Sequence, residues 1–368
     1  MVYDEEGFVY PKVNEDICVE CGACVKICPI CAEHIPQEDY LETYAGYSTN
    51  AEIMSNCTSG GFVTELSQHI IHQGGVVYGV AYDESYVRSQ YIRVETEEGL
   101  KVLMGSKYVQ SEKKDIYLKV KQDARAGRLV LFVGCPCDIA ALKLFLKTEY
   151  ENLYTCELVC MGVTSYKIAE DYKNYTEKKH SSKLVYINAR SKKRGWFVPQ
   201  LEERFENGKE KLSTLFGTYY GYGFQVYNRP SCFQCRYRNK SGFADFRVGD
   251  FWGIKQTDPF WNPEGVSCIF VRTERGQQVM NELKEKGFQL FITDYDTATI
   301  NNMSSRVNKP IKYQELRKKF AYEYREHGLI KACKATESMP VKIKRYAPQR
   351  VQWLLKRIYH VLRDTRTK

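Results

Sequence analysis

Four cysteines near the N-terminus constrain this chain more than any other feature of its sequence. Cys18, Cys21, Cys24 and Cys28 follow the spacing Cys-x2-Cys-x2-Cys-x3-Cys, and Pro29 comes directly after them. Bacterial-type ferredoxins wrap a 4Fe–4S cluster with this spacing, because the short gaps let one tight loop direct several sulfurs inward. Zinc sites more often use two separated Cys-x2-Cys pairs. The motif therefore predicts a 4Fe–4S cluster rather than a zinc ion.

The sequence leaves the fourth ligand of this cluster open. In two-cluster ferredoxins the last cysteine of each run binds the other cluster, but this chain has only one such run. Either Cys28 closes the same cluster, or Cys31 or Cys57 replaces it, or an upstream repeat that would carry a second cluster is missing before Met1.

Fourteen cysteines is an unusual number for a chain of 368 residues. The N-terminus is acidic and lacks the pattern of a signal peptide, so we expect a cytoplasmic protein, in which cysteines bind metal or do redox work rather than form disulfides. The formal net charge is +9, but two clusters that each contribute about −2 with their thiolates would lower it to roughly +5. Since no basic aromatic motif is present either, we expect no nucleic-acid binding.

Helix-like and strand-like patterns alternate from about residue 50 onward. The predicted helices cover residues 62–73, 114–126, 139–147, 165–179 and 277–286, and the predicted strands cover 76–83, 91–96, 128–134, 153–160, 184–190, 197–205, 211–216, 266–273 and 288–296. Asp138 is a suitable cap for the third helix, and Asn207-Gly208 predicts a hairpin turn between the strands at 197–205 and 211–216. Residues 228–265 are expected to be loop-rich. The alternation predicts an α/β fold, α+β in part, with a largely parallel sheet.

A second group of cysteines is scattered along the rest of the chain. Cys137 and Cys160 each follow a predicted strand, and in α/β sheets ligands gather at the carboxyl ends of strands. Cys137 also lies at the start of a helix, where backbone donors and the dipole favour a net-negative cluster. Cys232 and Cys235 lie in the loop-rich segment. These four residues form a shared metal site, or they are buried structural thiols.

Six segments of the chain, in order and at matching spacing, carry a family resemblance. They are residues 57–83, 105–111, 131–143, 160–165, 229–239 and 244–254. They resemble the beta subunits of coenzyme F420 hydrogenases and dehydrogenases, a family that includes bacterial relatives. The likeness runs from about residue 1 to residue 290 and is specific for the family, although not for a substrate.

The resemblance implies an iron–sulfur flavoprotein with a mixed-sheet α/β core. A small ferredoxin-like 4Fe–4S segment (1–45) would precede the family's N-terminal (46–127) and C-terminal (128–300) domains, and a basic helical tail (301–368) would follow. The core would carry FAD and a second 4Fe–4S cluster. Carried over residue by residue, the ligands of the core cluster are Cys137, Cys160, Cys232 and Cys235.

Three residues depart from the family pattern. Cys57 stands where relatives often have serine, Cys135 where they often have threonine, and Met161 where they often have histidine. Cys57 or Cys135 could therefore serve as an alternative ligand or as a redox thiol. Basic residues beside Cys232 and Cys235 either balance the charge of the core cluster or bind an acidic substrate; they are Arg236, Arg238 and Lys240.

The segment Thr58-Ser59-Gly60-Gly61 directly precedes a predicted helix. Ser59 can cap that helix, and the glycines would let the pyrophosphate of FAD approach exposed amides. From the residues alone this is a plain capped helix, whereas the resemblance implies part of the flavin site. The expected cofactor-binding residues are Ser59, Gly60, Gly61, Thr64, Lys107, Tyr108, Asp245 and Asp250. Lys107 and Asp250 are also the catalytic candidates.

Several of these candidates have structural alternatives. Lys107 is a cation suited to phosphate or to a reduced flavin, and Tyr108 stacks on a ring or simply packs. Asp245 and Asp250 contact the flavin or the substrate, or they hold the loop beside Cys232 and Cys235.

The expected function is electron transfer coupled to an organic reaction. Electrons would run, in either direction, between ferredoxin or another redox subunit, the N-terminal cluster, the core cluster, FAD and a small-molecule substrate such as coenzyme F420. The alternative is a non-catalytic electron-transfer subunit that docks on a partner oxidoreductase. The sequence leaves oligomerisation open.

A basic stretch near the C-terminus, residues 341–359, has a helical pattern. Apolar residues in and just beyond it gather near one face, opposite lysines and arginines; they are Val351, Leu354, Leu355, Ile358 and Leu362. Such a helix packs on its own domain, docks on a partner or lies on a membrane surface.

Overall fold

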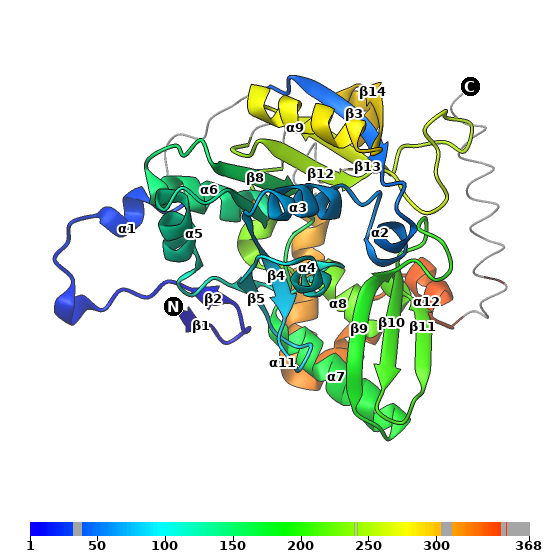
Figure 1. Cartoon of the computed structure of the whole chain (residues 1–368). Helices are drawn as coiled ribbons and strands as arrows, with labels where there is room; N and C mark the ends of the chain where they lie inside the picture. Colours follow the sequence, from blue (N-terminus) through cyan, green and yellow to red (C-terminus); the bar gives the residue numbers. More distant parts are fainter. Residues whose placement is uncertain (32–38, 239, 241, 303–310, 347–350, 352–368) are drawn as a thin grey trace.

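The computed structural model describes residues 1–31, 39–238, 240, 242–302, 311–346 and 351. A nine-stranded mixed sheet has the strand order β14-β3-β13-β12-β8-β7-β4-β5-β6, and a separate three-stranded sheet has the order β11-β10-β9 (Figure 1). The predicted α/β fold class with a mixed sheet is therefore confirmed.

The strands and helices alternate along most of the chain. The strands are β1 (Val2–Tyr3), β2 (Val9–Tyr10), β3 (Glu42–Tyr47), β4 (Val76–Tyr82), β5 (Ser89–Val94), β6 (Ser111–Glu112), β7 (Val130–Gly134), β8 (Leu153–Leu158), β9 (Leu184–Ser191), β10 (Gln200–Phe205), β11 (Glu210–Thr214), β12 (Phe246–Asp250), β13 (Ser267–Val271) and β14 (Gln289–Thr293). The α-helices are α1 (Ala23–Lys26), α2 (Ala51–Asn56), α3 (Phe62–His72), α4 (Glu97–Leu100), α5 (Ile116–Arg125), α6 (Pro136–Leu146), α7 (Tyr166–His180), α8 (Tyr219–Val226), α9 (Glu274–Glu285), α10 (Tyr295–Thr299), α11 (Ile311–Thr336) and α12 (Met339–Tyr346). Short 3-10 helices are η1 (Glu15–Ile17), η2 (Lys101–Leu103), η3 (Leu215–Gly217) and η4 (Pro230–Gln234).

The centre of the large sheet is parallel, and much of its remainder is antiparallel. Strands β4, β7, β8 and β12 are parallel neighbours, whereas β13, β3 and β14 on one side and β5 on the other join by antiparallel pairing. The predicted parallel sheet thus holds for the centre only. Strands β3 and β12 fall in segments for which the sequence predicts no strand.

Helices cover both faces of the large sheet, which explains why β7 reads as an unbroken apolar run. Leu131 and Val133 pack in one cluster with residues of α3 and α9, whereas Val130 and Phe132 pack in another cluster with residues of α5 and α6. Successive side chains of a strand point to opposite faces, so a central parallel strand needs apolar residues at every position.

The three-stranded sheet and the helices α7, α8 and α11 form a second core. The predicted turn at Asn207 and Gly208 joins the antiparallel strands β10 and β11. Gly208 has φ of 81°, a conformation that glycine adopts readily. The hairpin prediction is therefore confirmed.

The predicted cap of α6 is wrong. The helix begins at Pro136 with Cys135 as its N-cap residue, and Asp138 lies inside the first turn. The carboxylate of Asp138 accepts a hydrogen bond from Tyr91 at 2.8 Å and lies 2.8 Å from the ammonium of Lys113. Two tertiary partners therefore use the group that the sequence assigns to capping.

The described part of the C-terminal tail packs on its own chain. In α12, Arg345 donates from Nε to the carbonyl of Gly217 at 2.9 Å and pairs with Glu337. Apart from Val351, the predicted apolar face of the tail lies outside the described residues. No helix among the described residues is long and apolar enough to cross a membrane.

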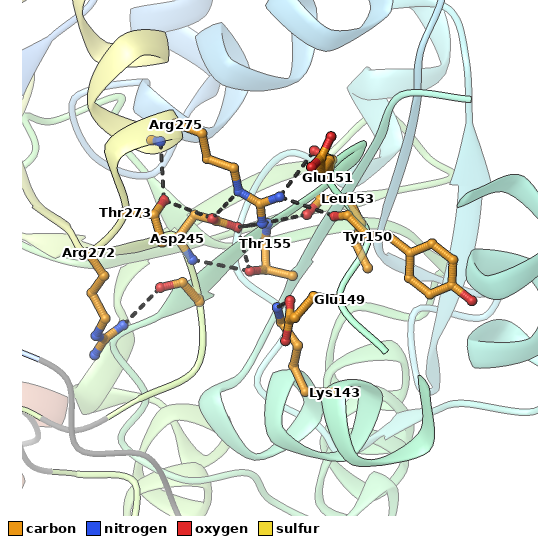
Figure 2. A network of polar contacts seen from close by, with 12 residues as sticks. Lys143, Glu149, Tyr150, Glu151, Leu153, Thr155, Asp245, Arg272, Thr273 and Arg275 are labelled. Atoms are coloured by element: carbon orange, nitrogen blue, oxygen red, sulfur yellow. Dashed lines mark hydrogen bonds and ion pairs between the residues drawn. The ribbon is translucent and has the colours of Figure 1, made fainter. Parts of the chain in front are cut away.

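A buried carboxylate joins the middle of the large sheet to α9 (Figure 2). Asp245 is 2% exposed and accepts hydrogen bonds from the amide of Thr155 at 2.8 Å, the hydroxyl of Thr273 at 2.8 Å and Nε of Arg275 at 2.7 Å. Arg275 also donates to the carbonyl of Leu153 at 2.8 Å. Burial alone would raise the pKa of Asp245, but Arg275 and the Thr155 amide outweigh it and hold this pKa below its usual value.

We expect the substitution Asp245→Asn to lower the free energy of unfolding by about 2–4 kcal/mol, because it leaves buried donors and the Arg275 charge without their carboxylate. The matched control is Glu149→Gln at an exposed partner of Lys143, which should change it by less than about 0.5 kcal/mol. Urea denaturation of both variants measures the difference.

The pH dependence gives a second check on the same residue. Since the pKa of Asp245 is lowered in the folded state, its contribution to stability is present above the unfolded-state pKa of about 4 and is lost as the pH falls through the folded-state value. Stability of the Asp245→Asn variant should therefore fall less steeply with acid than that of the parent chain. Equal slopes would show that Asp245 does not contribute as described.

Candidate functional site

Five cysteines from three parts of the chain come together at the carboxyl ends of β7 and β8. Cys135 hydrogen-bonds with Cys160, and Cys137 lies within electrostatic range of Cys160 and Cys235. Cys232 lies within range of Cys160 and Cys235. All five are free thiols. The four predicted core ligands are thus brought together, and Cys135 joins them as a fifth sulfur; we call these five residues the core cysteine group.

A buried cation faces the core cysteine group. Arg238 is 6% exposed and lies within electrostatic range of Cys160, Cys232 and Cys235, where its charge favours the thiolates. Its Nη2 donates to the carbonyl of Met161 at 2.8 Å. Its Nε is buried and has no hydrogen-bond partner among the residues that the structure describes. A buried unpaired donor beside thiols is expected where an acceptor such as cluster sulfide binds.

One thiol of the group is poised for ionisation. A hydrogen bond from Cys135, helped by the amide of Gly162 and the charge of Arg238, lowers the pKa of Cys160 although burial opposes this shift. On the other side of the group, Lys113 lies within electrostatic range of Cys137. Metal ligands must be deprotonated thiols. Burial raises the pKa values of Cys137, Cys232 and Cys235, so these thiols would lose their protons on binding metal. The charges of Arg238 and Lys113 would then balance a net-negative 4Fe–4S cluster.

The described side chains do not form a ready-made site for a single metal ion. Within the described part of the chain, no three His, Cys, Asp or Glu side chains are arranged to hold one metal ion. A cubane distributes its four cysteine ligands over four iron atoms, so their sulfurs lie farther apart than those around one zinc ion. Four cysteines are the usual ligand set of such a cluster.

The N-terminal cysteines lie on the segment that runs from the end of η1 through the short helix α1 to Cys31, which we call the N-terminal loop. Cys18, Cys21, Cys24 and Cys31 are exposed, and Cys28 is half-buried. Gly22 has φ of 67° and open space around the position of a Cβ atom, so the loop can turn tightly beside a bulky group. The chemistry and spacing of these donors fit a cluster at the surface.

The structure narrows the alternatives for the fourth N-terminal ligand. Cys28 and Cys31 hydrogen-bond with each other, and Cys24 lies within electrostatic range of Cys31. Cys57 follows α2, which lies on the opposite side of the molecule from α1 (Figure 1). Its sulfur lies 3.3 Å from Nζ of Lys192 instead. Cys57 therefore belongs to neither cysteine group, and Cys28 and Cys31 stay as the candidates.

The Ser59–Gly61 turn is bound to the large sheet by hydrogen bonds, and Ser59 does not cap α3 as the sequence predicts. Ser59 donates from its hydroxyl to the carbonyl of Val266 at 3.0 Å, and the cap residue of α3 is Gly61 with φ of 85°. The predicted Ser59 cap is therefore wrong. A Cβ atom on Gly60 would lie 2.3 Å from the carbonyl oxygen of Gly46 and 2.6 Å from the amide of Ser267, so close backbone packing requires this glycine. Thr64 lies half-buried in the first turn of α3.

Lys107 and Tyr108 are engaged with the protein itself. The ammonium of Lys107 is shared among four backbone carbonyls, of which the nearest are those of Met104 at 2.7 Å and Leu103 at 2.8 Å. Burial lowers the pKa of Lys107 to about 7. Tyr108 stacks on Phe224 with ring centroids 4.2 Å apart. The stacking of Tyr108 matches its packing alternative, whereas the carbonyl contacts of Lys107 were not predicted.

The remaining acidic candidates have separate environments. Asp245 belongs to the buried network of Figure 2. Asp250 receives two hydrogen bonds from Arg190, at 2.9 and 3.0 Å, and one from the indole of Trp196 at 2.7 Å. Trp196 in turn stacks on Trp252 with ring centroids 5.3 Å apart. Asp250 therefore lies in a region of aromatic rings and one fixed ion pair.

Three of the segments expected at the flavin meet in that region. The hydroxyls of Thr58 and Ser106 lie 3.4 Å apart, and Arg190 contacts both Tyr108 and Asp250. Arg190, Trp196 and Trp252 were not predicted from the sequence. A signal for Arg190 was present, because a lone charged residue in an apolar strand pattern needs a buried partner.

Comparison with known proteins gives three related matches. Residues 127–294 match the family model for the C terminus of the coenzyme F420 hydrogenase/dehydrogenase beta subunit. The chain is 20% identical over 276 residues to one of the subunits of the F(420)H(2) dehydrogenase of Methanosarcina mazei, a match that covers 73% of this chain and 71% of that protein. A chain in the structure of the F420-reducing [NiFe] hydrogenase complex from Methanosarcina barkeri aligns with a TM-score of 0.52 and 18% identity, over 78% of this chain and 94% of that one.

We expect Gly60→Ala to lower the free energy of unfolding of flavin-free protein by about 1–3 kcal/mol, because its methyl group would overlap the backbone of two neighbouring strands. The control is Gly99→Ala, whose added Cβ would approach only side-chain atoms, the nearest at 3.2 Å, and should be within about 0.5 kcal/mol of the parent. Thermal denaturation checks both. A stable Gly60→Ala variant that has lost only flavin binding would contradict the packing role.

Proposed function

Because the chain belongs, through residues 127–294, to the family of coenzyme F420 hydrogenase and dehydrogenase beta subunits, we propose that it is an iron–sulfur flavoprotein oxidoreductase. It exchanges electrons between a redox partner and a small organic substrate. The observation that carries the proposal is the convergence of Cys135, Cys137, Cys160, Cys232 and Cys235 around a buried arginine.

The proposed site has two cluster-binding parts and one flavin-binding part. When bound, the 4Fe–4S clusters supply single-electron transfer and FAD supplies hydride exchange with an organic partner. The N-terminal loop holds one cluster through Cys18, Cys21, Cys24 and either Cys28 or Cys31. The core cysteine group holds the other, with Cys137, Cys160, Cys232 and Cys235 as its first choice of ligands and Cys135 as the alternative.

The residues around the clusters and flavin control charge and water. Arg238 partly neutralises a cluster held by the core cysteine group, which favours its reduced form. Arg190 and Asp250 form a fixed ion pair beside the rings of Trp196 and Trp252. In a desolvated site such a pair orients a polar substrate or flavin edge without reorganisation. The substrate is coenzyme F420 or another planar small molecule of similar redox chemistry.

A second candidate function is a non-catalytic electron-transfer subunit. The relative from Methanosarcina mazei is named as a subunit and the structural neighbour as part of a hydrogenase complex, which favours a docked role beside partner subunits. Turnover of the isolated chain with an artificial electron donor separates the two functions. Reduction of an organic acceptor by the isolated chain identifies an enzyme, whereas reduction of its own centres without turnover identifies an adaptor.

We expect anaerobic reconstitution with iron, sulfide and FAD to give about eight iron atoms per chain, four for each of two clusters, together with bound flavin. The double substitution Cys137→Ser and Cys232→Ser should lower this to about four iron atoms, because the core cluster loses two ligands. Iron analysis, absorbance and EPR spectroscopy measure the outcome. The control is Cys333→Ser, a buried thiol of α11 outside both groups, which should retain full loading. A colourless parent protein without flavin would refute the proposal.

A further inference from the structure

Tyr237 lies between the two cysteine groups. Its ring is 4% exposed, and its hydroxyl donates to the carbonyl of Pro29 at 2.7 Å. It lies within electrostatic range of Cys28 on the N-terminal loop and of Cys137 and Cys235 in the core. Tyr237 therefore contacts the residue that follows Cys28 and lies near cysteines of both groups.

The chain connects this tyrosine to a cysteine on each side. Pro29 follows Cys28 directly, and Tyr237 follows Cys235 by two residues. A route from the sulfur of Cys28 to the sulfur of Cys235 thus consists of covalent bonds and one hydrogen bond of 2.7 Å. Electronic coupling decays more slowly along covalent bonds and short hydrogen bonds than across gaps between atoms, so the hydrogen bond of Tyr237 completes a continuous route between the two groups.

The contact between the groups is reinforced by cations of the same loop. Arg229 lies within electrostatic range of Cys28 and stacks on Tyr10, with 4.2 Å between its guanidinium carbon and the ring centroid. Arg236 lies within range of Cys31. A cluster with four thiolates is net negative, so these cations hold a loaded N-terminal loop against the loop of Cys232 and Cys235.

We propose that Tyr237 and its hydrogen bond to Pro29 form the path by which electrons pass between the N-terminal and core clusters. The proposal rests on the proposed function, since it requires both clusters. With both clusters bound, one electron would pass from the N-terminal cluster, which would be oxidised by one electron, to the core cluster, which would be reduced by one electron. No bond forms or breaks, and Tyr237 keeps its proton. A one-electron donor of the ferredoxin class, or dithionite in its place, supplies the electron.

The test is Tyr237→Phe in the full-length, reconstituted protein. This variant keeps the ring but removes the hydrogen bond to Pro29. After rapid mixing with a limiting amount of dithionite, freeze-quenched EPR follows the transfer of the electron from the N-terminal to the core cluster. We expect the transfer rate to fall several-fold. The control is Tyr10→Phe, which keeps the ring that stacks on Arg229 and removes a hydroxyl outside the path; it should retain the parent rate.

Two further measurements show whether Tyr237 carries the electron or only holds the two loops together, and whether the protein binds both clusters at all. The magnetic interaction between the two fully reduced clusters reports their separation, and it should be the same in Tyr237→Phe as in the parent. An unchanged transfer rate would overturn the proposal, and so would a slower rate accompanied by a weakened magnetic interaction. A parent protein that binds fewer than two clusters would instead refute the proposed function, as its iron content shows before any kinetic measurement.

Discussion

The parallel pairing of β8 with its two neighbours determines where the core sulfurs lie. In the sheet register, Gly134 of β7 is opposite Glu157 of β8, and Leu158 of β8 is opposite Val248 of β12. Parallel strands in register end at the same edge, so the cysteines that follow β7 and β8 meet there. The loop after α8 needs one anchor to bring in the remaining two thiols. The amide of Arg229 provides it by donating to the carbonyl of Val163 at 2.9 Å.

A buried ionic group lies in the same strands. Glu157 accepts hydrogen bonds from Arg247 at 2.6 Å and from Arg272 at 2.7 Å, and all three side chains are buried. Desolvation makes such groups expensive, so their net contribution to stability is small, whereas removal of one partner is strongly destabilising. With one acid and two bases the group carries a net charge of +1. Since Arg247 lies within electrostatic range of Cys235, this charge complements a net-negative cluster.

Sequence reasoning succeeded where local pattern and topology decide the outcome. The apolar run of β7 and the turn residues Asn207 and Gly208 gave correct elements, because strand periodicity and turn chemistry are local. The convergence of Cys137 and Cys160 followed from the rule that parallel strands end together. Cys232 and Cys235 reach the carboxyl ends of β7 and β8 through a loop whose path no local sequence pattern encodes. For these two residues the expectation came from the family resemblance.

The predictions that failed concern two polar side chains with several available partners. Asp138 and Ser59 have the right chemistry for helix caps, but each bonds to a residue far away in the sequence instead. The carboxylate of Asp245, whose cofactor role stays a prediction, is likewise enclosed by a network that spans more than a hundred residues of the chain. Hydrogen bonds of this kind are set by the assembled fold, so they are visible only in three dimensions.

The unequal exposure of the two cysteine groups has a consequence for handling the protein. The thiols of Cys18, Cys21 and Cys24 are exposed, whereas those of the core group are partly buried. Oxygen and chelators would therefore reach a cluster on the N-terminal loop before one held by the core group. A preparation that has lost the first of the two proposed clusters would then keep part of its visible absorbance, so colour alone does not report full loading.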